Sequence, residues 1–114
     1  GGSVSAADAL EELQGRLHNA HEPTQAAKVW MKIGQIRQKR QDFSEARAAY
    51  RTAMRLDVAQ HGCLANLAQL EAHSGNLSEA LDLIQRAMLL APTTASYAEF
   101  QRRLQEGLAK RRAS

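Results

Sequence analysis

Apolar positions along this chain recur every three or four residues, which is the spacing that places them on one side of an α-helix. Between residues 27 and 94 these stretches come in pairs, and a short polar break divides each pair, at 41–42 and at 74–76. Gly75 suits the left-handed backbone that follows a helix, and the next helix can be capped by Asp42 or Ser44 in the first pair and by Asn76 or Ser78 in the second. Pro92 ends the second pair because it cannot continue a helix. The pattern predicts an all-α fold of antiparallel helix-turn-helix units.

The two pairs are copies of one unit. A shift of 34 residues brings Ala27–Gln60 onto His61–Thr94 without a gap, and seven positions become identical. The identical pairs are Gln35/Gln69, Ser44/Ser78, Glu45/Glu79, Ala46/Ala80, Ala53/Ala87, Met54/Met88 and Leu56/Leu90. Self-similarity at a fixed period indicates a repeat protein in which each unit is one helical hairpin.

The residues at the repeated positions resemble those of the tetratricopeptide repeat. In the first unit they are Trp30-x-x-Ile33-Gly34, Ala46-x-x-x-Tyr50 and Ala53-Met54-Arg55-Leu56-Asp57. In the second unit they are Leu64-x-x-Leu67-Ala68, Ala80-x-x-x-Ile84 and Ala87-Met88-Leu89-Leu90-Ala91-Pro92. The small residues among them let paired helices approach closely. Arg37 and Glu71 depart from the family pattern, since each replaces a large aromatic residue. The resemblance implies two full repeats, 27–60 and 61–94, in a right-handed superhelix.

A single helix is expected before the repeats, within residues 4–22. Ser5 followed by Asp8 resembles a capping box, and Leu10, Leu13 and Leu17 would share one face. We interpret this helix as a degenerate second helix of a preceding unit, with docking elsewhere as the alternative. Residues 1–3 have the composition of a tag or linker remnant and are left out of the fold.

Residues 95–112 are predicted to form a C-terminal capping helix. Tyr97, Phe100, Leu104 and Leu108 give this segment one apolar stripe, which would cover the core of the last repeat. The alternative is that the segment is the first helix of a third repeat.

The composition offers few residues for catalysis or metal binding. Cys63 is the only cysteine, so an internal disulfide is excluded, and we expect it to be a small buried side chain. His18 and His21 are three residues apart, but no carboxylate or cysteine completes a metal site with them. We find no phosphate-binding loop, signal peptide or membrane span. We therefore expect no enzyme activity, cofactor or metal, and a cytoplasmic location.

Charge is the more informative property. Eight basic and three acidic residues give Ala27–Gln60 a net charge of +5, although the whole chain carries only +3. In the resembled family, one face of each repeat's first helix lines a concave groove where ligands bind. Carried over to this chain, the partner-binding residues are Lys28, Met31, Lys32, Gln35, Gln38, Lys39, Ala65, Asn66, Gln69, His73 and Arg103, with Glu99 also within reach. The alternative for each is a merely solvated side chain.

This surface would suit a peptide or helix with acidic residues, because its amides can also bond a partner's backbone. Some relatives bind a C-terminal carboxylate through a clamp of basic residues and asparagines. Only Asn66 matches that clamp, while Ser96 and Phe100 replace its lysine and arginine. We therefore predict no such clamp.

The sequence thus predicts a protein-interaction module, an adaptor or scaffold. The alternative is a regulatory or assembly domain of a larger enzyme or complex, and self-association through an uncapped end is also open. Nucleic-acid binding is the weaker hypothesis, despite the basic tail Lys110-Arg111-Arg112, because the basic residues form no continuous stripe. The acidic residues Asp8, Glu11 and Glu12 suggest that the first helix shields the basic face of the first repeat or mimics a ligand, with simple end-capping as the alternative.

Overall fold

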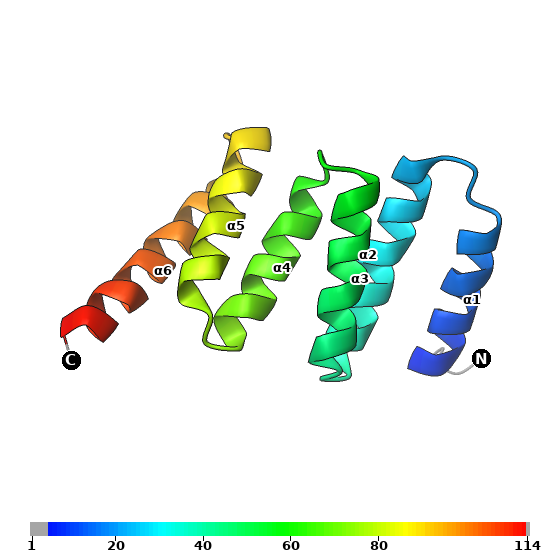
Figure 1. The fold of residues 1–114 in the computed structure, drawn as a ribbon, viewed down its shortest axis with the longest axis horizontal. Helices are drawn as coiled ribbons and strands as arrows, with labels where there is room; N and C mark the ends of the chain where they lie inside the picture. Colours follow the sequence, from blue (N-terminus) through cyan, green and yellow to red (C-terminus); the bar gives the residue numbers. More distant parts are fainter. Residues whose placement is uncertain (1–4, 114) are drawn as a thin grey trace. The chain divides into compact units, whose positions relative to one another are not determined.

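The structure is a computed structural model that describes residues 5–113 (Figure 1). Its helices are α1 (Ala6–His18), α2 (Pro23–Lys39), α3 (Phe43–Leu56), α4 (His61–His73), α5 (Leu77–Leu90) and α6 (Ala95–Ala113). Within the described range the regular structure is helical throughout, which confirms the predicted all-α class. Residues up to Gln60 form one compact unit and those from His61 onward form a second.

In the first unit, α2 and α3 form a hairpin around the side chain of Tyr50. This tyrosine is fully buried, and its ring lies against Gly34 of α2. A Cβ atom added at Gly34 would lie 2.5 Å from Tyr50 Cε1, so only a glycine fits beneath the ring. The Tyr50 hydroxyl donates a hydrogen bond of 2.7 Å to Gln38 Oε1. The small residue predicted at position 34 therefore serves the close approach of the two helices.

Helix α1 packs against α2 and extends the same core. Leu13 lies in a buried cluster with Val29, Ile33 and Ala49, and further leucines of α1 pack against this cluster. The helix begins where the sequence predicts, since Ser5 Oγ accepts a hydrogen bond of 3.1 Å from the Asp8 backbone N–H. Burial of the leucine stripe explains why a short helix is stable at this position.

The second unit repeats the hairpin with α4 and α5 and adds α6 alongside α5 (Figure 1). Leu104 of α6 is buried, and Tyr97, Phe100 and Leu108 are half-buried, so the predicted apolar stripe faces inward. Gly107 lets the Leu77 side chain approach, because a Cβ atom there would lie 3.1 Å from Leu77 Cδ1.

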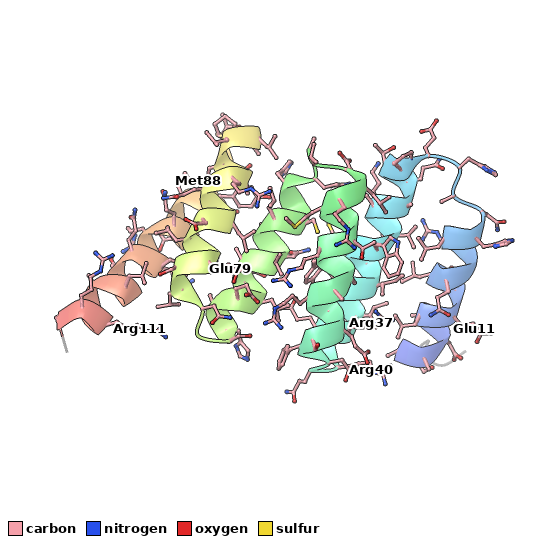
Figure 2. The ribbon with its side chains drawn as sticks, in the orientation of Figure 1. Glu11, Arg37, Arg40, Glu79, Met88 and Arg111 are labelled. Atoms are coloured by element: carbon pink, nitrogen blue, oxygen red, sulfur yellow. The ribbon has the colours of Figure 1, made fainter. Side chains whose placement is uncertain are left out.

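Two polar contacts fix the ends of α6. Near its start, the Tyr97 hydroxyl lies 2.8 Å from His61 Nδ1, and the two rings meet edge to face. Near its end, Arg111 Nη1 donates a hydrogen bond of 2.8 Å to the carbonyl oxygen of Gly75 (Figure 2). Arg111, assigned by sequence to a basic tail, therefore contacts the turn between α4 and α5.

Each hairpin turns through one residue with left-handed backbone. Gly75 has a φ of 90°, as predicted, and Gln41 at the equivalent position has a φ of 68°. The N–H groups of the following residues, Asp42 and Asn76, close the turns by bonding the carbonyl oxygens of Arg37 (2.9 Å) and Glu71 (2.8 Å).

Of the predicted capping residues, Asp42 and Asn76 hold the N-cap positions of α3 and α5, but neither side chain makes a capping hydrogen bond with the helix backbone. The Asp42 carboxylate lies 3.5 Å from Arg40 Nε. Asn76 Nδ2 instead donates to Glu71 Oε2 at 3.3 Å. The side chains turn back toward the preceding helix because it offers them a charged partner.

Candidate partner-binding face

The basic side of α2 is exposed to solvent. Lys28, Lys32, Gln35 and Lys39 are all exposed, and their spacing of three or four residues places them on one side of the helix. Met31 is half-buried at the margin of this side. We call these five residues the α2 face.

Gln38 was predicted to belong with them, but the structure gives it a role within the hairpin. It is half-buried, and its Oε1 atom accepts the hydrogen bond of the Tyr50 hydroxyl. Its amide oxygen is therefore engaged with α3. This contact could not be predicted from spacing within one helix, because Tyr50 lies twelve residues away on the next helix.

Two depressions lie between α1 and α2, side by side along the same edge of the α2 face. The larger, of about 370 Å³, is lined by Ala9, Glu12, Leu13, Arg16, Lys32, Gln35, Ile36 and Lys39. The smaller, of about 340 Å³, is lined by Arg16, Asn19, Ala20, Gln25, Lys28 and Val29. We call the two depressions together the α1–α2 groove.

Arg16 is the residue that the two depressions share. With Lys28, Lys32 and Lys39 it gives the groove four cationic side chains against one carboxylate, that of Glu12. Sequence analysis did not identify Arg16. Two features of the sequence could have pointed to Arg16. It lies one helical turn after Glu12, and it borders the leucine stripe of α1.

Helix α1 does not shield the α2 face. The three lysines and Gln35 stay exposed with α1 in place. The helix instead supplies one wall of a groove whose other wall is α2. Of the acidic residues on which the shielding hypothesis was based, only Glu12 lines the groove.

The predicted residues of the second unit lie on α4 and α6. Gln69 and His73 are exposed on α4, whereas Ala65 and Asn66 are half-buried. Arg103 is exposed on α6. These five positions remain predictions.

Glu99, also considered for this surface, binds Arg102 on its own helix. The hydrogen bond from Arg102 lowers the pKa of Glu99 below its ordinary value. This carboxylate is therefore ionised and paired within α6.

The thiol of Cys63 is unsuited to act as a nucleophile. It is fully buried in α4, and this burial raises its pKa to about 12. The sequence-based expectation of a small buried residue is confirmed. Within residues 5–113, no three side chains of histidine, cysteine, aspartate or glutamate gather in a way that could hold a metal ion. The described helices include none with the length and apolarity required to cross a membrane.

Comparison with known proteins supports the interpretation of the first predicted repeat. Residues 27–57 match the family described as "Tetratricopeptide repeat". No curated protein matches the sequence.

Solved structures share the fold. A crystal structure of MamA superimposes with a TM-score of 0.80 at 16% identity, covering 91% of this chain and 59% of MamA. A second MamA structure gives a TM-score of 0.79, also at 16% identity, covering 91% of this chain and 55% of that one. The translocator chaperone of type III secretion, SycD from Yersinia enterocolitica, gives 0.69 at 19% identity, covering 92% of this chain and 70% of SycD. The chain therefore spans less than two thirds of MamA. At such identities the likeness concerns the fold.

Proposed function

We propose that this chain, whose residues 27–57 match the tetratricopeptide repeat family, works by holding a segment of another protein, not by catalysis. The surface proposed for this role in the first unit is the α2 face. The observation that carries the proposal is the row formed by Lys28, Lys32, Gln35 and Lys39, which stays exposed along the edge of the α1–α2 groove.

The chemistry of this row favours a peptide or helical segment with acidic side chains. Three lysines attract carboxylates, and the Gln35 amide can both donate to and accept from a partner's backbone. The groove beside the row would let a partner side chain bury apolar surface, which the exposed lysines alone do not offer. SycD, similar in fold, is described as a chaperone, and a chaperone role is consistent with binding another polypeptide.

The second unit would contribute through Asn66, Gln69, His73 and Arg103, as the sequence predicts. The proposal for the first unit does not depend on them. An acidic partner, the absence of nucleic-acid binding and a cytoplasmic location belong to the same proposal.

Site-specific photo-crosslinking in cell extract tests this function. A crosslinking amino acid at Gln35 should form adducts with a partner protein, and the charge reversals K28E and K32E in the same chain should remove them. Gln85 is the matched control, because it is also an exposed glutamine but lies on α5. Equal adducts from both positions, or adducts from Gln35 that survive the charge reversals, would contradict the proposal.

A further inference from the structure

The α1–α2 groove is more than a basic surface, because apolar side chains also line it. Each of its depressions is lined by buried or half-buried apolar side chains and by exposed polar or charged ones. Ile36, with Leu13 and Ala9, lies in the larger depression, and Val29, with Ala20, lies in the smaller. We propose that this groove binds an acidic amphipathic helix of a partner protein, with one apolar side chain in each depression. The inference rests on the proposed function and specifies its ligand.

The distance between the depressions favours a helix over an extended strand. Val29 and Ile36 are seven residues apart on α2, which corresponds to about 10.5 Å along the helix axis. In a bound helix, side chains seven residues apart face the same way and are separated by about the same 10.5 Å. In an extended strand, about three residues span this distance, and their side chains point to opposite faces. A bound helix would therefore direct two apolar side chains to the two depressions at the spacing of Val29 and Ile36.

The charges of the groove require acidic residues on the flanks of that helix. Lys28, Lys32 and Lys39 stand on the α2 wall and Arg16 on the α1 wall, so a carboxylate on either flank of a bound helix would find a cation. A partner helix with basic flanks would meet the same lysines and be repelled.

Arg16 is the residue that this inference adds to the site. Because it lines both depressions, it lies at the point where the middle of a bound helix would pass. Its guanidinium can bind a carboxylate in bidentate fashion. Glu12, one turn earlier on α1, lies on the same side of the helix and within the same depression. We expect Arg16 to recognise a glutamate or aspartate between the two apolar residues.

A protein helix fits this groove better than a nucleic acid does. The floors of the depressions are aliphatic, whereas single-stranded nucleic acids are usually bound by exposed aromatic side chains that stack on bases. Trp30, the one tryptophan, packs against the buried cluster of the first unit.

Fluorescence anisotropy with the full chain and designed peptides provides the test. The probe is a labelled peptide of glutamate and alanine with two leucines seven residues apart. Its isomer has the same composition but places the leucines five residues apart, on different faces of a helix. A third peptide has glutamine in place of glutamate. We expect the first probe to bind, the other two to bind about tenfold more weakly, and binding to weaken as salt is raised.

Charge reversal at Arg16 tests the central contact. R16E should weaken the first probe about tenfold, because attraction is replaced by repulsion. R86E is the matched control, since Arg86 is exposed on α5 and its reversal changes the net charge equally. We expect R86E to change the affinity less than about twofold. The milder R16Q should fall between the two, and circular dichroism checks that each variant is helical.

Several results would overturn the inference. Equal binding of the two isomers would exclude the paired apolar contacts, and equal effects of R16E and R86E would exclude Arg16 from the site. If K28E with K32E weakened the probe while R16E did not, the α2 face would still hold a partner and only the groove would be excluded. Failure of all peptides, or tighter binding of an oligothymidylate than of the first probe, would exclude an acidic helix as the ligand. The crosslinking at Gln35 tests the proposed function separately.

Discussion

The two helical hairpins share one period, but different contacts stabilise each of them. In the first, Tyr50 fills the interior against Gly34, and in the second the equivalent positions hold Ile84 and Ala68, both buried. The helices that flank them also differ. Helix α1 buries leucines against α2 but leaves a groove beside it, whereas α6 covers α5 and bonds the turn of its hairpin through Arg111. The two copies therefore share the spacing of their helices but differ in the side chains of their interiors and in the contacts of the helices that flank them.

The largest change in the free energy of unfolding is expected when the small residues of the two hairpins, Gly34 and Ala68, are exchanged for one another. Gly34→Ala forces a methyl group against the Tyr50 ring, and we expect a loss of about 2–3 kcal/mol in the free energy of unfolding. The reverse change in the second hairpin, Ala68→Gly, should cost about 1 kcal/mol, since it meets no such contact. Denaturant unfolding monitored by circular dichroism measures both.

A double variant shows whether the ring is the cause. With Tyr50→Ile, which copies the second hairpin, the additional cost of Gly34→Ala should fall below about 1 kcal/mol. A cost that stayed unchanged in the Tyr50→Ile background would mean that the glycine serves another purpose.

The next effect concerns the left-handed residue of each turn. Gln41→Gly should stabilise the chain by about 1 kcal/mol, because glycine adopts a φ of 68° without the strain of a side chain. Gly75→Gln should destabilise it by about the same amount. A Cβ atom at Gly75 would meet no atom closer than 3.8 Å, so the cost there comes from the backbone alone. Effects of the same sign at the two turns would show that the turns are not equivalent.

A smaller effect is expected where α6 meets the turn. Arg111→Ala removes the hydrogen bond to Gly75 and should cost about 0.5–1.5 kcal/mol. Arg112→Ala is the control, because Arg112 is its exposed neighbour, and we expect almost no change. Hydrogen exchange of the backbone amides around the turn should quicken in the first variant only. Equal rates in both variants would indicate that α6 is held by its apolar stripe alone.

The smallest effect concerns Tyr97, where burial raises the pKa of the phenol above its ordinary value of 10. The folded state therefore favours the neutral phenol more than the unfolded chain does. Its stabilising contribution is complete below pH 10 and is lost as the pH rises through the folded-state pKa. The alkaline decline in stability should accordingly be shallower for Tyr97→Phe than for the parent chain. Identical alkaline profiles would show that the pKa of Tyr97 is the same in the folded and the unfolded chain.

Much of the fold could be predicted because its signals are local. The helix stripes, Gly75, Pro92 and the leucines of α1 each act within a few residues. The break at 41–42 was predicted, but the left-handed backbone of Gln41 could not be, since glutamine has no preference for it and is held there by the helices on both sides. Asp42 and Asn76 hold predicted N-cap positions, but their side chains contact Arg40 and Glu71 instead of the helix backbone.

The candidate site was predicted in part for the same reason. Exposure of Lys28, Lys32, Gln35 and Lys39 follows from helix geometry, so the sequence alone identified the basic side of α2. It could not identify Arg16, because that residue enters the site only through the packing of α1 on α2.

The sequence by itself determined the period, the helices and the side of each helix that is apolar, since these depend on spacing along the chain. Only the tertiary structure decided what lies opposite each side. It placed Gln38 under the Tyr50 hydroxyl, Arg111 on the Gly75 carbonyl and Arg16 between two depressions. Such contacts join residues that are distant in sequence, and their partners are fixed by how the helices pack rather than by any pattern within one of them.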